Sequence, residues 1–64
     1  MFTTRIEFNP GQAFTSYQCS SFSIIGNIAS LYEVPASEVA IQETEDDGDI
    51  VTVRGVRIGR VVAR

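Results

Sequence analysis

Histidine, lysine and tryptophan are absent from this chain of 64 residues, and two of these absences remove classes of chemistry. Without histidine there is no imidazole to act as a general base or to activate a nucleophile. Without lysine there is neither a Schiff-base amine nor the phosphate-binding lysine of a P-loop. The sequence therefore predicts a protein that is not an enzyme and that needs no cofactor.

Cysteine is nearly absent as well, because Cys19 is the only one and no internal disulfide can form. Small secreted domains usually carry several cysteines, so a reducing, cytoplasmic setting is favoured. No histidine is available to activate the Cys19 thiol, and we expect a small core residue rather than a nucleophile.

Long apolar runs are also missing, and none approaches the roughly 20 residues that a membrane-spanning helix requires. The stretch from Met1 to Arg5 reaches a charged residue at once and lacks the apolar region of a signal peptide. At 64 residues the chain is near the lower limit for a single hydrophobic core. We expect one soluble domain, residues 1–64, without a deep cleft.

Acidic and basic residues are concentrated in different segments of the chain, although the net charge is only −3. Residues 33–49 hold seven acids and no base, and residues 54–64 hold four arginines and no acid. An acidic surface is repelled by phosphate backbones and attracted to basic proteins. The pattern predicts a basic protein surface as partner, and no direct contact with nucleic acid or membrane.

The first half of the chain predicts a hairpin followed by a helix. Apolar residues alternate over 2–8, the turn signal Asn9-Pro10-Gly11 follows, and a polar extended run over 12–19 indicates an edge strand. A helix is expected over 22–33, and Pro35 follows its end. Two rows of this helix carry apolar residues at helical spacing: Ile24, Ile28 and Leu31, and beside them Ile25, Ala29 and Tyr32.

Three further strands are expected over 39–45, 49–54 and 56–62, and turn chemistry suggests their register. A three-residue loop Asp46-Asp47-Gly48, with Gly48 in the left-handed conformation, places Glu45 opposite Asp49 and keeps the apolar residues on one face. The alternative two-residue loop at Asp47-Gly48 breaks that face. A tight turn at Arg54-Gly55 then pairs Val53 with Val56, Val51 with Ile58 and Asp49 with Arg60.

The resulting order is β-β-α-β-β-β, an α+β domain with one helix packed on a mainly antiparallel sheet. This element order resembles the β-grasp arrangement of ubiquitin-like domains, in which a hairpin is followed by a helix and further strands. Ubiquitin-like carriers end in a Gly-Gly tail that is adenylated, whereas this sequence ends in Val62-Ala63-Arg64. Conjugation or sulfur transfer is therefore not expected.

The stretch from Glu43 to Asp49 carries the strongest functional signal. Its candidate partner-binding residues are Glu43, Glu45, Asp46, Asp47 and Asp49. Like charges that face one another across strands are destabilising, so their presence favours an outside partner. A solvated loop that only aids solubility is the competing interpretation. Arg60, expected opposite Asp49, is interpreted as its ion-pair partner.

A calcium loop is a third interpretation of the same stretch, because Glu43, Glu45 and Asp47 have EF-hand spacing. Position 12 of such a loop would be Arg54, where a bidentate carboxylate is required, and the flanking segments are strands. A true EF-hand is therefore not expected and no dedicated metal site is predicted, although weak binding of calcium or magnesium at the loop stays open.

Together these features favour a non-enzymatic protein-binding module. Its closest functional class is a small acidic inhibitor of phage or mobile-element type, such as an anti-CRISPR or nuclease inhibitor, that mimics nucleic acid with its hairpin tip. The alternative is a ubiquitin-like adaptor or a small homo-oligomeric protein that binds through a sheet edge or an exposed apolar face. Phe14 is a candidate anchor for the alternative, and a homodimer is compatible with it.

Overall fold

The predicted α+β fold is confirmed in the computed structural model, which describes residues 3–46 and 48–63. The element order is β-β-α-β-β-β with a short 3₁₀ turn before the third strand. The elements are β1 (Thr3–Phe8), β2 (Ser16–Ser20), α1 (Ile24–Tyr32), η1 (Ala36–Glu38), β3 (Val39–Thr44), β4 (Gly48–Val53) and β5 (Val56–Ala63).

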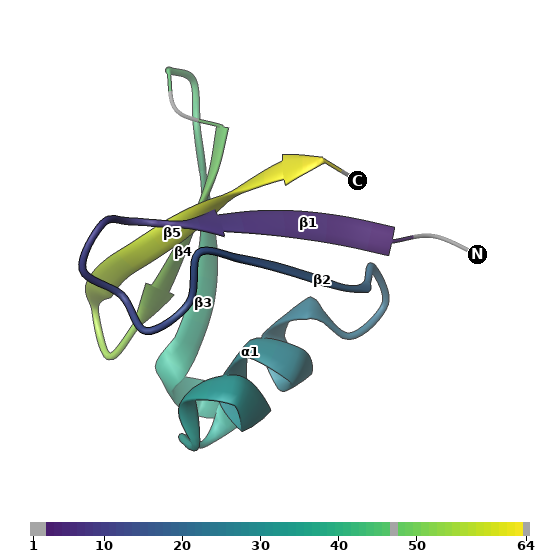
Figure 1. Ribbon diagram of the computed structural model, residues 1–64, viewed down its shortest axis with the longest axis vertical. Coiled ribbons are helices and arrows are strands. Elements are labelled where there is room, and N and C mark those ends of the chain that lie inside the picture. Colours follow the sequence, from purple (N-terminus) through teal and green to yellow (C-terminus); the bar gives the residue numbers. More distant parts are fainter. Residues whose placement is uncertain (1–2, 47, 64) are drawn as a thin grey trace.

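The strands form one antiparallel sheet in the order β2-β1-β5-β4-β3. The predicted edge position of β2 is confirmed, and β3 forms the opposite edge. The segment that contains α1 carries the chain from one edge to the other, and Figure 1 shows the helix on one side of the sheet. Sheet and helix thus make two layers, and the other side of the sheet faces solvent.

The core lies between α1 and the facing side of the sheet. Alternation in β1 buries Thr4, Ile6 and Phe8 and exposes the residues between them, as the period-2 pattern predicts. Ile6, Ile28 and Val51 are fully buried, and burial of such a side chain contributes about 1.5–3 kcal/mol. The buried cluster consists of Ile6, Phe8, Ile28, Ala29, Val39, Val51, Val53 and Ile58.

β1 and β5 approach each other closely at Gly59. Gly59 pairs with Phe8, and a Cβ atom at Gly59 would overlap the Glu7 carbonyl oxygen and lie 3.0 Å from the Phe8 Cα. Glycine is therefore required here by the close approach of two strands rather than by a turn. The central strand β5 can lie against β1 only because this position has no side chain.

The helix and β2 begin later than predicted. The helix begins at Ile24 rather than at residue 22, and β2 begins at Ser16 rather than at residue 12. Residues 12–15 instead form a loop whose aromatic side chain packs on the helix: the Phe14 ring lies 5.9 Å from the ring centroids of both Phe8 and Tyr32. Packing between distant segments overrides the extended pattern here.

The turn between β4 and β5 has the predicted residues. Arg54 and Gly55 have φ values of 53° and 79°, the left-handed pair of a type I′ turn, and Val53 pairs with Val56. The Arg54 guanidinium binds the Glu38 carboxylate, which ties this turn to the start of β3. Within residues 3–46 and 48–63, no helix combines the length and apolar character needed to cross a membrane.

Candidate binding surface at the β3–β4 hairpin

The far end of the β3–β4 hairpin gathers the acids that the sequence singled out. Figure 1 shows this end at the opposite end of the long axis from α1. Glu43, Glu45 and Asp46 are exposed, and Asp49 is half-buried. We call these four residues the acidic hairpin end. Asp47, the fifth predicted binding residue, lies outside the described residues.

The observed register differs from both registers considered from the sequence. Glu43 pairs with Asp49 and Thr44 with Gly48, so β3 is shifted by two residues from the preferred register. Glu45 and Asp46 form a turn, and Gly48, with φ 72°, is the first residue of β4. The Gly48 carbonyl accepts a 2.8 Å hydrogen bond from Thr44 Oγ1. The predicted left-handed conformation of Gly48 is confirmed, but the predicted position of the loop is wrong.

The shift by an even number of residues preserves which side chains share a face. Val39 pairs with Val53 and Ile41 with Val51 on the side that meets the helix. The next pair on that face, Glu43 with Asp49, is acidic. Glu43 and Asp49 therefore continue the apolar face beyond its end, and Glu45 lies in the turn instead of in the strand.

Glu43 and Asp49 belong to the closer of the two pair types that alternate in an antiparallel ladder. The Arg54 N–H donates to the Glu38 carbonyl at 2.8 Å, which identifies 38/54 as a hydrogen-bonded pair in this register. Because the two pair types alternate, Glu43 and Asp49 form a non-hydrogen-bonded pair, with Cα atoms about 4.5 Å apart. Like charges at that position destabilise the hairpin by about 0.2–1 kcal/mol, by analogy with favourable pairs.

The expected pairing of Asp49 with Arg60 is wrong. A bulge at Ile58 adds one residue to β5, so Asp49 pairs with Val61 and Arg60 pairs with Ile50. Neighbouring residues of a strand point to opposite faces, which places the Asp49 and Arg60 side chains on opposite sides of the sheet. Arg60 lies across from Glu7 on β1 instead.

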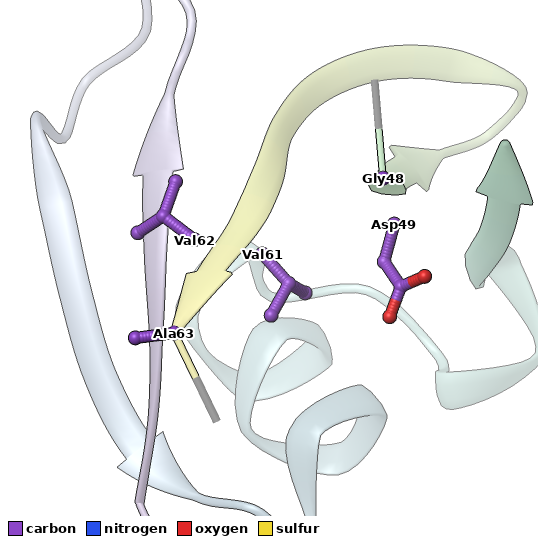
Figure 2. Close-up of a pocket in the computed structure, with 5 residues that line it drawn as sticks. All are labelled: Gly48, Asp49, Val61, Val62 and Ala63. Atoms are coloured by element: carbon purple, nitrogen blue, oxygen red, sulfur yellow. The ribbon is translucent and has the colours of Figure 1, made fainter. Parts of the chain in front are cut away.

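An open groove of about 280 Å³ adjoins the acidic pair, lined by Gly48, Asp49, Val61, Val62 and Ala63. Figure 2 shows the Asp49 carboxylate and the Val61 side chain side by side on the same side of the sheet. A carboxylate beside an apolar wall suits a basic side chain, whose aliphatic stem packs on apolar atoms while its charged head reaches the acid. Within the described residues, no three His, Cys, Asp or Glu side chains are grouped to hold a metal ion.

Cys19 and Phe14, two other residues singled out from the sequence, contribute to packing within the fold. Cys19 is buried opposite Thr4 in the β1–β2 pair, and burial raises the pKa of its thiol, which lowers its reactivity. Phe14 is 37% exposed but packs edge-on against Tyr32 in the aromatic cluster. The Tyr32 hydroxyl donates a 3.0 Å hydrogen bond to Gln12 Oε1, so this cluster fastens the loop to the helix.

An apolar patch near the start of the helix was missed from the sequence. Phe22 is 80% exposed and Ile25 is 39% exposed, and both line a second groove of about 310 Å³ together with Ile24 and Ile41. Helical spacing places Ile25 in one apolar row with Ala29 and Tyr32, but only Ala29 of that row is buried. Phe22, which belongs to neither apolar row, was the signal available in the sequence.

Comparison with protein-family models, curated proteins and solved structures finds no match to this chain.

Proposed function

We propose that this protein is a non-enzymatic binding protein that docks its acidic hairpin end onto a basic surface of a partner protein. The observation that carries the proposal is the direct pairing of Glu43 with Asp49 beyond the apolar core. Carboxylates that face each other across strands repel, and Glu45 and Asp46 in the adjoining turn add further exposed negative charge. Cations on a partner surface stabilise carboxylates gathered in this way.

The chemistry of this surface favours arginine and lysine side chains of the kind that bind phosphate. Carboxylates accept the same charge-assisted hydrogen bonds as phosphate oxygens, and an arginine guanidinium binds them in a bidentate manner. The groove beside Asp49 offers Val61 and Ala63 to the aliphatic stem of such a side chain. The partner is therefore a protein whose basic site otherwise holds nucleic acid or phosphate.

The mode of action that follows is inhibition by occupancy. A small acidic protein that fills a nucleic-acid site excludes the natural ligand, as phage or mobile-element inhibitors of nucleases and anti-CRISPR proteins do. The single buried thiol of Cys19 suits a reducing cytoplasm. Catalysis by the protein itself is not part of the proposal.

The test compares two charge-reversed variants as baits for affinity capture from a lysate of the native host. Glu45→Lys/Asp46→Lys changes the acidic hairpin end, and the matched control Glu7→Lys/Glu33→Lys makes the same charge change at exposed acids elsewhere. We expect the wild type and the control to retain the same nucleic-acid-binding protein. The hairpin variant should lose it.

The retained protein should also be released by added double-stranded DNA or RNA and by raising the salt concentration, because both compete with exposed charge pairs. Retention of the same protein by the hairpin variant would overturn the proposal. In that case the acids would serve only to keep the protein soluble.

A further inference from the structure

The outer edge of β3 exposes a defined set of backbone groups. Because 38/54 is a hydrogen-bonded pair, the even-numbered residues of β3 bond to β4 and the odd-numbered residues turn their N–H and C=O groups away from it. The Val39 N–H donates to the Ala36 carbonyl of η1. The edge therefore presents the N–H groups of Ile41 and Glu43 and the carbonyls of both residues, which are groups that an added strand can bond.

An apolar groove adjoins this edge on the side of the sheet that carries the helix. Phe22, Ile24, Ile25 and Ile41 line this groove of about 310 Å³ between the start of α1 and β3, and we call them the apolar edge patch. Phe22 and Ile25 are exposed. A side chain of an added strand that points to this side would remove part of their apolar surface from water.

Negative charge follows the apolar edge patch along the same strand. Side chains two residues apart share a face, so Glu43 lies next to Ile41 on the helix-facing side, beside its cross-strand partner Asp49. None of the described arginines forms an ion pair with Glu43, and Arg54 is bound to Glu38 at the other end of β3. The chain as a whole has a net charge of −3. The occupant that complements this edge is therefore both apolar and basic.

We propose that the occupant is an extended segment of the basic partner protein that adds a strand beside β3, an inference that rests on the proposed function. The backbone of this segment bonds the open groups of Ile41 and Glu43. An apolar side chain opposite Ile41 packs on the apolar edge patch, and a lysine or arginine two residues away lies opposite Glu43. The recognised pattern is an apolar and a basic residue separated by one position.

A second copy of the chain complements this edge poorly. Two chains that each have a net charge of −3 repel one another, and β3 of a second copy brings another Glu43 rather than a basic side chain. Sedimentation velocity of the protein alone should therefore show a monomer at the concentration used for the titration below. A dimer that protects the Ile41 and Glu43 amides from exchange would overturn the proposal, because the edge would then already be occupied.

Two synthetic peptides of equal composition test the recognised pattern. Thr-Arg-Thr-Ile-Thr-Arg-Thr places its isoleucine and both arginines on one face of a strand in either direction, whereas Thr-Thr-Arg-Ile-Arg-Thr-Thr places the arginines on the opposite face. Because the two peptides have the same charge, general attraction to an acidic protein contributes equally to both. Each peptide is titrated into the isotope-labelled protein, and the backbone amide signals are followed by NMR.

The first peptide should bind with a dissociation constant of about 1 mM or tighter, and the second at least about tenfold more weakly. The amide protons of Ile41 and Glu43 should move downfield because they gain hydrogen bonds. The amide of Gln42, which bonds to β4, and the amides of β2 at the other edge should move less. Equal dissociation constants for the two peptides, or no shift at Ile41 and Glu43, would overturn the proposal.

The variant Phe22→Ser/Ile25→Ser tests the apolar edge patch while leaving the edge backbone and the acids in place. It should weaken the first peptide at least about threefold, and circular dichroism verifies that it folds. An unchanged dissociation constant in the folded variant would overturn the role of the patch.

The titration and the affinity capture fail separately. The titration contains no host protein and reports on the edge of β3, whereas the capture compares charge changes at Glu45 and Asp46. A failed titration removes the added strand and leaves the capture result as it stands. A failed capture leaves the peptide result unchanged and removes the acidic hairpin end as the docking surface.

Discussion

The two ends of the β3–β4 hairpin share one face of the sheet but differ in chemistry. Val51 and Val53 are buried in the core cluster to which Ile28 of the helix belongs, whereas Asp49, next on the same face, pairs with Glu43 beyond it. The same two strands continue without interruption from one end to the other. The difference is that the helix covers the apolar end and does not cover the acidic end. Helix contact therefore decides where this face is a core, and where the contact stops the face is available for another role.

Substitutions in the core at the apolar end should lower the free energy of unfolding the most. Replacing the fully buried Ile28 with alanine leaves a cavity under the sheet and should cost about 2–5 kcal/mol of unfolding free energy. A single small core supplies roughly 3–5 kcal/mol in all, so Ile28→Ala should be largely unfolded at room temperature. Urea titration followed by circular dichroism measures the change.

Ile25 provides the matched control, because it has the same side chain in the same helix but is 39% exposed. Ile25→Ala should change the unfolding free energy by less than about 1 kcal/mol, since little buried volume is lost and alanine favours the helix. Equal losses at Ile25 and Ile28 would contradict the view that burial distinguishes the regions.

A smaller effect is expected from a change in the opposite direction, the addition of a methyl group. Gly59→Ala places a Cβ against the backbone of Glu7 and Phe8, and such overpacking typically costs about 1–3 kcal/mol. Gly26→Ala in the helix meets no atom within 4 Å and should stabilise the protein by about 0.5–1 kcal/mol. Thermal unfolding of the two variants should therefore shift in opposite directions.

The aromatic cluster beneath the helix predicts a pH effect at alkaline values. Burial raises the pKa of Tyr32 above its ordinary value. The Tyr32 hydroxyl therefore keeps its proton to a higher pH in the folded protein than in the unfolded chain. The contribution of Tyr32 to the free energy of unfolding is fully present below about pH 10, the pKa of tyrosine in the unfolded chain. This contribution is lost as the pH rises through the pKa of Tyr32 in the folded protein. Urea midpoints should fall over that range, and less steeply in Tyr32→Phe.

The alternation of the strands could be predicted from the sequence, but the register could not. Any register shifted by an even number of residues keeps the same side chains on one face, here those of Val39, Ile41, Val51 and Val53. The face on which these residues are buried could therefore be predicted without knowing the register. The loop position depends on local bonds, such as the one from Thr44 Oγ1 to the Gly48 carbonyl, that differ little in energy between alternatives.

Other features depend on contacts between distant segments. The bulge at Ile58 separates Asp49 from Arg60, and nothing in the apolar pattern of 56–62 indicates an extra residue. The position of Phe14 against Phe8 and Tyr32 likewise depends on packing between the loop, β1 and the helix. The acids of the candidate site could be predicted from the sequence, but neither the pairing of Glu43 with Asp49 nor the exposed apolar residues Phe22 and Ile25 could.

The central claim is that the acidic hairpin end is maintained against the stability of the fold. The most direct measurement is the urea unfolding midpoint of Glu43→Gln, which keeps the side-chain shape and removes one charge of the Glu43–Asp49 pair. We predict a gain of about 0.2–1 kcal/mol, whereas Glu7→Gln, which removes an acid 3.9 Å from Arg5, should give no gain. A loss of stability in Glu43→Gln would contradict the claim, because the carboxylate would then serve the fold.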